Sequence, residues 1–259
     1  MAQRFQRLSR SLSIIIPAYN EENRLPSTLL EVTNYLAASE WRPVEVLVVD
    51  DGSSDGTVQV AQKHAAQMHA ASCAQNGCRV RVLRNPGNHG KGFAVRYGMQ
   101  EGVGDWLLFT DADLSTPIAE LEKLWAAVQG GDVAVAIGSR ALDRSLIGVR
   151  QPEFRERAGQ IFNWVMRMVL RLPLHDTQCG FKLFRQDAAR AVFERQQLDR
   201  FGFDAEALFI ARKLGFEIRE VPVRWNDVAG SKVSMLSGAR GFVDLVRVRL
   251  NDLRGIYKV

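Results

Sequence analysis

Short apolar runs alternate with amphipathic stretches through the first half of the chain. The runs contain β-branched and aromatic residues and predict buried strands, whereas the stretches between them have apolar residues at helical spacing. Strands buried on both faces that alternate with helices are typical of an α/β domain with a mainly parallel sheet flanked by helices. Strands are predicted at 13–16, 44–49, 79–83, 106–110 and 133–137, and helices at 57–71, 92–100, 117–129 and from Pro26 onward.

The second half of the chain has longer amphipathic patterns. Helices are predicted over 153–172, 205–214 and 238–257, and an alternating strand is predicted over 217–225. Because no repeat, low-complexity tract or linker interrupts the chain, we expect one domain over residues 1–235 and a basic amphipathic helix over 236–259 that could associate with a membrane. The apolar stripe of this helix consists of Phe242, Val246, Leu250, Leu253 and Tyr257.

The charge of the chain is unevenly distributed. The 259 residues are 46% hydrophobic and 24% charged, which suits one sizeable globular domain. Residues 1–130 carry 12 Lys and Arg against 14 Asp and Glu, whereas residues 131–259 carry 22 against 15. The basic second half predicts an anionic partner, which could be a phosphate, a membrane surface or nucleic acid. No nucleic-acid-binding motif accompanies the charge, so nucleic acid is not expected as a partner.

The hydropathy pattern and the cysteines bear on location. A membrane span needs about 20 mostly apolar residues, and no such run is present. The odd number of cysteines, with no C-x-x-C, predicts a reducing compartment. We therefore expect a cytoplasmic protein that attaches peripherally to the inner face of a membrane through two basic amphipathic segments, 140–171 and 232–259. The alternative is that both segments pack on the protein's own core.

Polar and acidic stretches follow the first four predicted strands, at 17–22, 50–56, 85–92 and 111–113. Ligands of parallel α/β sheets bind beyond the carboxyl ends of the strands. Asp111 and Asp113 suit Mg²⁺ or Mn²⁺, which bridges one or two carboxylates to a nucleotide diphosphate, although capping of the next helix is an alternative role. Asp50 and Asp51 could accept hydrogen bonds from a ribose or a base, or could simply belong to a turn.

The loop after the first strand excludes two common nucleotide sites. It contains neither G-x-G-x-x-G nor a Walker sequence, so a dinucleotide fold and a P-loop are not expected. A glycine-rich stretch that includes Lys91 could allow the backbone to approach a phosphate.

Six stretches together resemble a known family. In chain order they are IPAYNEE (16–22), VDDGSSDGT (49–57), DAD (111–113), GSR (138–140), DTQCGFKLF (176–184) and GSKV (230–233). On these stretches the chain resembles inverting family 2 glycosyltransferases of the GT-A fold. More narrowly, it is similar to the dolichyl-phosphate (polyprenyl-phosphate) β-glucosyltransferases and to the related mannosyl enzymes.

The resemblance implies a Rossmann-like GT-A fold and a role for each matched position. Asp111 and Asp113 would hold Mg²⁺ or Mn²⁺ and the diphosphate, beside Ala112. Arg140 and Lys232 would act on the phosphates, with Asp113 as the third catalytic residue. Ser115 stands where mannosyl relatives often have glutamine. The nucleotide would be lined by Pro17, Ala18, Tyr19, Glu21 and Asp51.

The implied reaction is inverting transfer of glucose from UDP-glucose to a polyprenyl monophosphate. Such a phosphate is largely dianionic at pH 7, so it is already a nucleophile and needs no catalytic base. Further cations that could hold it are Arg150, Arg155 and Lys182. One alternative is GDP-mannose as the donor. Another is a hydroxyl acceptor, which would need a base such as Asp204 or Glu206. A silent nucleotide-binding subunit is disfavoured by the intact pair of aspartates.

Overall fold

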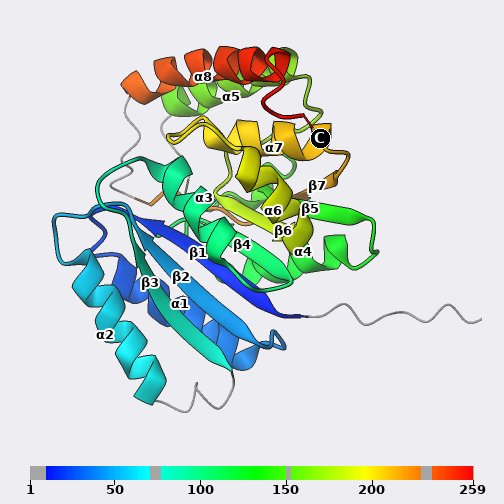
Figure 1. Cartoon of the computed structure of the whole chain (residues 1–259). Coiled ribbons are helices and arrows are strands. Elements are labelled where there is room, and N and C mark those ends of the chain that lie inside the picture. The colour runs from blue at the N-terminus through cyan, green and yellow to red at the C-terminus, as the bar shows by residue number, and fades with distance from the viewer. Residues whose placement is uncertain (1–9, 71–76, 150–152, 229–234, 259) are drawn as a thin grey trace, which may run out of the picture.

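A seven-stranded sheet forms the centre of the computed structural model, which describes residues 10–70, 77–149, 153–228 and 235–258 (Figure 1). The strand order is β3-β2-β1-β4-β6-β5-β7. Only β6 runs antiparallel to its neighbours β4 and β5. The strands are β1 (Leu12–Ala18), β2 (Val44–Asp50), β3 (Cys78–Arg84), β4 (Trp106–Thr110), β5 (Val133–Ser139), β6 (Phe181–Arg185) and β7 (Glu217–Pro222).

Alternate residues of each strand face two different layers of helices, because side chains alternate across a strand. Ile14 and Ile16 belong to the core beneath α1 (Leu25–Ala38), α2 (Thr57–Ala70) and α4 (Leu121–Val128). Ile15 belongs to the core on the other face, under α3 (Lys91–Glu101), α6 (Gln186–Arg195) and α7 (Phe203–Lys213). The α/β class and the mainly parallel sheet flanked by helices are thus confirmed.

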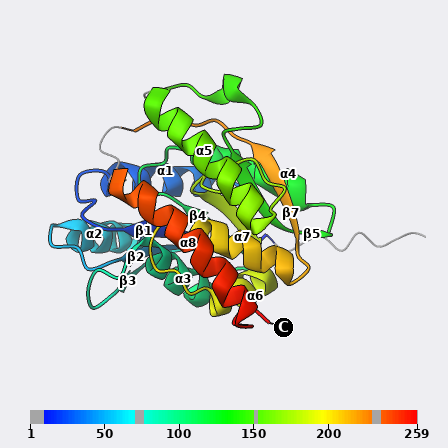
Figure 2. The same ribbon diagram turned by 90° about the horizontal axis from the view of Figure 1, so that it is seen from above.

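Two long helices form an outer layer beyond α7. Helices α5 (Glu153–Leu170) and α8 (Met235–Leu253) lie side by side there (Figure 2). The Phe162 and Phe242 rings meet edge to face, with centroids 5.2 Å apart. Leu245 and Val248 of α8 are buried toward the core. The amphipathic helices predicted in the second half therefore pack on one another and on the domain.

The structure differs from the predicted elements at two places. Strand β6 and helix α6 were not predicted. The C-terminal helix ends at Leu253, and Tyr257 is fully buried with its hydroxyl donating to Glu206, so Tyr257 is not part of an exposed apolar stripe. Within the described residues, no helix is long and apolar enough to span a membrane.

Candidate active site

The first part of the site lies at the end of β1. Pro17 and Ala18 are the last two residues of this strand and pair with Val49 and Asp50 of β2. Tyr19 follows and is 38% exposed. The Glu21 amide donates to Thr57 Oγ1 at 2.8 Å, which fastens this turn to the loop after β2. Four of the residues predicted to line a nucleotide therefore lie together at the carboxyl edge of the sheet.

The Asp51 carboxylate holds a neighbouring loop in place. It accepts hydrogen bonds from Asn85 Nδ2 at 3.0 Å and from the backbone amides of His89 at 3.0 Å and Gly90 at 2.7 Å. Gly90 has φ of 113°, and a Cβ there would lie 2.5 Å from the Asp199 carbonyl oxygen, so the turn requires glycine. Asp51 thus uses three of the roughly four acceptor positions of a carboxylate within the protein, and its contact with the nucleotide stays a prediction.

Asp50 differs from Asp51 in having one carboxylate oxygen with no hydrogen-bond partner among the described residues. One of its oxygens accepts from the Ser53 amide at 3.2 Å, and Oδ2 is buried without a hydrogen-bond partner among the described residues. Leaving a buried polar atom unsatisfied costs about 1–3 kcal/mol, so a ligand N–H or O–H that reached this oxygen would be stabilised.

Asp111 and Asp113 follow β4 directly, as predicted. The Asp111 amide donates to the Gly180 carbonyl at 3.2 Å. The Ala112 carbonyl accepts from Thr28 Oγ1 at 2.6 Å, which fixes the peptide between the two aspartates. Asp113 Oδ1 accepts from the Ser115 amide at 2.9 Å, so one oxygen of this carboxylate does cap the following turn.

Two lysines, neither of them favoured from the sequence, flank the Phe109 ring. Lys91 Nζ lies 5.2 Å and Lys182 Nζ 5.5 Å from its centroid. Lys91 forms an ion pair with Asp111 Oδ1 at 2.6 Å, whereas Lys182 pairs with the buried Asp204. Lys182 is 2% exposed and is therefore not available to an acceptor phosphate, contrary to its candidacy in the sequence.

The surroundings shift the pKa values of Lys91 and Asp204. Burial would lower the pKa of Lys91, but the carboxylates of Asp111 and Asp204 raise it above its ordinary value. Burial raises the pKa of Asp204 even though Lys182 and Lys91 act in the opposite direction. Because Lys182 also donates to Asp204, this carboxylate is bound in an ion pair and is not free to act as a base.

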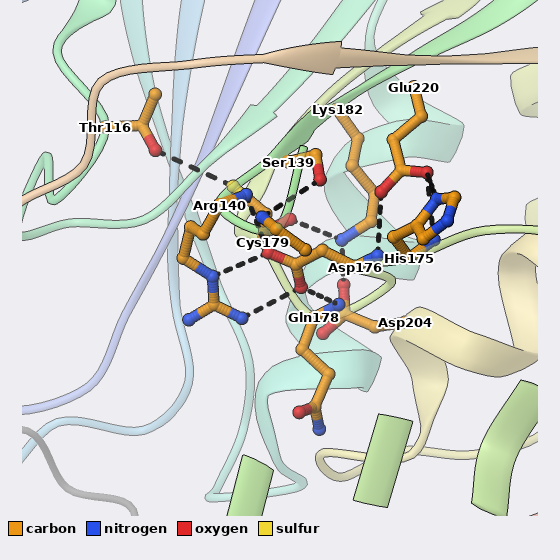
Figure 3. Close-up of polar contacts among 11 residues, drawn as sticks. Thr116, Ser139, Arg140, His175, Asp176, Gln178, Cys179, Lys182, Asp204 and Glu220 are labelled. Atoms are coloured by element: carbon orange, nitrogen blue, oxygen red, sulfur yellow. Dashed lines mark hydrogen bonds and ion pairs between the residues drawn. The ribbon is translucent and has the colours of Figure 1, made fainter. Parts of the chain in front are cut away.

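Arg140 lies at the end of β5 and forms a two-point ion pair with Asp176 (Figure 3). Its guanidinium also covers the Trp225 ring at 5.3 Å. Burial alone would raise the pKa of Asp176, but Arg140 holds that pKa below its usual value. Burial would lower the Arg140 pKa, but the charge of Asp176, with a further contribution from Asp111, raises it, so this predicted phosphate-binding residue lies within the field of Asp111.

The stretch 176–184 connects these groups. Its Cys179 thiol contacts Thr116 Oγ1 at 3.7 Å, beside the loop of Asp113 (Figure 3). Burial raises the pKa of this thiol to about 11. The Asp176 amide donates to Glu220 of β7 at 2.7 Å. This stretch, one of the six that carry the family resemblance, thus lies on the side of β4 that is away from β1 and β2.

Several predicted residues do not contribute to the described site. Lys232 and Arg150 lie outside the described residues, and only the backbone of Arg155 is described. Glu206 accepts hydrogen bonds from the backbone amides of Gln197 and Leu198 and from Tyr257, so it holds the C-terminal end of the chain. These three hydrogen bonds give Glu206 a structural role.

The acidic groups suit a divalent cation that takes some of its ligands from the bound substrate. Among the described residues, no cluster of three or more His, Cys, Asp or Glu side chains could hold a metal ion. Asp111 is 30% exposed, and Asp113 uses only Oδ1 in its described hydrogen bonds. Mg²⁺ and Mn²⁺ prefer oxygen ligands, and Mg²⁺ typically uses one or two carboxylates together with phosphates and water. The donor set is therefore suited to a metal that arrives with a diphosphate.

Sequence comparison identifies relatives over most of the chain. The model of "Glycosyl transferase family 2" matches residues 13–193. A dolichyl-phosphate beta-glucosyltransferase of Drosophila melanogaster is 40% identical over 87% of this chain and 70% of its own length. The protein of the same name from Homo sapiens is 36% identical over 97% of this chain and 78% of its own. The protein of the same name from Saccharomyces cerevisiae is 32% identical over 95% of this chain and 76% of its own length.

Solved structures share the fold at lower identity. Glucosyl-3-phosphoglycerate synthase of Mycobacterium tuberculosis, crystallised with Mn²⁺, UDP and glucosyl-3-phosphoglycerate, has a TM-score of 0.67 at 17% identity and covers 92% of this chain and 80% of its own. Mannosyl-3-phosphoglycerate synthase of Rubrobacter xylanophilus has a TM-score of 0.67 at 17% identity, and the match covers 97% of this chain and 76% of that protein. These likenesses identify the fold as GT-A.

Proposed function

Since the chain belongs to glycosyl transferase family 2 and is a glycosyltransferase, we propose that it transfers glucose from UDP-glucose to the phosphate of a polyprenyl phosphate. The observation that carries this proposal is the identity of 32–40% to proteins named dolichyl-phosphate beta-glucosyltransferase, over nearly the whole chain. The pair Asp111 and Asp113 and the cations Lys91 and Arg140 give the chain groups suited to such a reaction.

The donor nucleotide would bind across the ends of β1, β2 and β4. Pro17, Ala18, Tyr19 and Glu21 would line its base and ribose. Asp50 supports a direct contact better than Asp51, because its buried Oδ2 has no partner among the described residues. Asp51 would shape the pocket by holding the loop that contains His89 and Gly90.

The diphosphate would lie against Asp111, Ala112 and Asp113. These two carboxylates would hold Mg²⁺ or Mn²⁺, which when bound offsets negative charge on the UDP leaving group. Arg140 would add positive charge on the same side. Its Asp176 partner fixes the guanidinium in orientation, so the charge is already in place before the substrate arrives.

The acceptor phosphate would attack C1 of glucose directly. The bond from C1 to the UDP oxygen breaks as a bond from C1 to an acceptor phosphate oxygen forms, so an α-linked donor yields a β-linked lipid phosphate. This nucleophile needs no base at pH 7 because its second pKa is about 6. The ion pair of Asp204 with Lys182 supports that acceptor over a hydroxyl, since it leaves Asp204 poorly suited to proton abstraction. Lys232 and Arg140 remain the cations proposed to hold the acceptor.

A membrane surface would bring the lipid acceptor to the site. We define the α5–α8 apolar face as Ile161, Trp164, Met168, Val243, Val246, Leu250 and Leu253, which are each 44–65% exposed except for Leu253 at 83%. Arg247 beside them is 65% exposed. Large apolar side chains next to arginine suit the interface of a bilayer that contains anionic lipid. We propose peripheral attachment through this face, on the cytoplasmic side of the membrane.

A two-donor assay tests the proposal. The purified full chain is incubated with Mg²⁺, a polyprenyl phosphate in detergent, and either UDP-[¹⁴C]glucose or GDP-[¹⁴C]mannose. Label from UDP-glucose alone should partition into organic solvent. If only label from GDP-mannose entered the lipid, GDP-mannose would be the donor in place of UDP-glucose. If neither donor labelled the lipid, the proposal of a polyprenyl phosphate acceptor would be wrong.

A further inference from the structure

We propose that the Lys91 ammonium acts as a substitute cation on Asp111, so that a divalent cation binds this protein tightly only together with the nucleotide. This inference rests on the proposed function, because it assumes that Asp111 receives the metal that accompanies a nucleotide sugar. It assigns to Lys91 a role in coupling the binding of the two ligands.

The Lys91 ammonium is in direct contact with the Asp111 carboxylate. Lys91 Nζ lies 2.6 Å from Oδ1. Both oxygens of Asp111 face the backbone of Gly180, where a Cβ would lie 2.0 Å from Oδ2 and 2.8 Å from Oδ1. A metal ion on Oδ1 would compete with the ammonium directly, and one on Oδ2 would lie beside it. Because Mg²⁺ sits about 2.0–2.1 Å from its oxygen ligands, the ammonium would repel it at either oxygen and has to move away.

The backbone around Lys91 is closely packed, whereas its side chain is partly exposed. A Cβ on Gly90 would lie 2.5 Å from the Asp199 carbonyl oxygen, and one on Gly92 would lie 2.5 Å from the Leu198 carbonyl oxygen. The backbone on both sides of Lys91 is thus packed directly against the segment before α7. The Lys91 side chain, in contrast, is 26% exposed and has the rotatable bonds of a lysine.

Among the described residues, two further acidic groups act on Lys91, namely Asp204 and Asp113. Asp204 is 6% exposed and already forms an ion pair with Lys182, and Asp113 would itself hold the metal, so neither carboxylate is free to receive the displaced ammonium. The diphosphate of a bound nucleotide would supply a new anionic partner. A metal ion that binds alone must therefore break the Lys91–Asp111 ion pair without compensation. When metal and nucleotide bind together, the diphosphate offsets the loss of that ion pair. Such coupling is reciprocal between the two ligands.

Mn²⁺ binding without turnover tests this inference. Free Mn²⁺ is measured by electron paramagnetic resonance in titrations of the full chain, with and without UDP. In Lys91→Met, Mn²⁺ alone should bind about tenfold more tightly than in the wild type, which corresponds to about 1.4 kcal/mol. The gain in Mn²⁺ affinity on adding UDP should shrink by tenfold or more. A lysine that only binds phosphate would weaken the ternary complex without strengthening binding of Mn²⁺ alone.

Two variants serve as controls. Lys91→Arg keeps the positive charge and should keep the weak binding of Mn²⁺ alone. Lys123→Met removes an ammonium that lies at the same 2.6 Å from a carboxylate, that of Glu120, and should change neither titration. Unchanged or weaker binding of Mn²⁺ alone by folded Lys91→Met would overturn the inference while leaving the proposed function in place. Failure of the wild type to bind Mn²⁺ even with UDP would overturn both.

Discussion

Arg140 and Asp176 face each other in a two-point ion pair, with Arg140 Nε 2.6 Å from Oδ2 and Nη2 2.9 Å from Oδ1. The pair joins the end of β5 to the stretch 176–184, which also supplies Lys182 and Cys179 to the site. A guanidinium held at two points by a carboxylate has a fixed orientation. The pair therefore both stabilises the fold and positions positive charge near Asp111.

Replacing Asp176 with asparagine should lower the free energy of unfolding by about 2–3 kcal/mol at pH 7, because Arg140 loses its buried counter-charge. The native pKa of Asp176 lies below its unfolded value. Its contribution is therefore complete above about pH 4 and is lost as the pH falls through the native pKa. Urea unfolding at several pH values should show the difference between wild type and variant shrinking in acid. A difference that stays constant down to pH 2 would contradict this account.

Asp113→Asn should reduce glucosyl transfer by about 10²–10³-fold, because it removes a charge proposed to hold the metal. The asparagine oxygen can still accept from the Ser115 amide, so the local turn and the Tm should be preserved. Asp143→Asn is a matched control, since Asp143 Oδ1 accepts from the Ser145 amide at 3.0 Å in the same i to i+2 arrangement. Near-normal turnover of the Asp113 variant would rule out its proposed role.

The double variant Trp164→Ser, Val246→Ser should bind vesicles of phosphatidylcholine and phosphatidylserine at least tenfold more weakly, since burial of each large apolar side chain contributes about 1.5–3 kcal/mol. Both residues are exposed, so stability should change little. Leu30→Ser on α1, with Leu30 56% exposed, is the control for loss of a surface apolar group. Co-sedimentation measures the binding, and equal binding by the double variant and the wild type would exclude the α5–α8 apolar face.

Tyr257→Phe should destabilise the protein by about 1 kcal/mol, because the buried Glu206 loses one donor but keeps the amides of Gln197 and Leu198. Turnover by the folded variant should be unchanged. Thermal unfolding followed by circular dichroism, together with the lipid-transfer assay, measures both quantities. Loss of turnover at full stability would instead give Glu206 a part in the reaction.

The alternation of strands and helices was predictable because each element carries its own period. The strands β1, β2 and β4 are buried on both faces, and their apolar runs stand out in the sequence. Strand β6 does not, because its second residue is Lys182. Burial of that charge depends on Asp204, which comes from α7, and a local pattern cannot reveal such a partner.

The sequence could locate those site residues that come directly after a predicted strand. Asp111 and Asp113 lie where the sequence indicates. The different roles of Asp50 and Asp51 could not be predicted, since they depend on which carboxylate meets the amides of a loop nearly forty residues further along the chain. The sequence indicates Lys91 only as part of a glycine-rich stretch, because its contact with Asp111 arises when α3 is placed beside the end of β4.

The configuration of the glucosyl lipid made by the purified chain tests the central proposal most directly. UDP-glucose, a polyprenyl phosphate and Mg²⁺ are incubated with the protein, and the extracted product is examined by ¹H nuclear magnetic resonance and mass spectrometry. We expect one glucose per lipid phosphate, joined at C1 in the β configuration, with one UDP released for each product. An α-linked product, or glucose recovered on a hydroxyl group, would contradict direct attack by the acceptor phosphate.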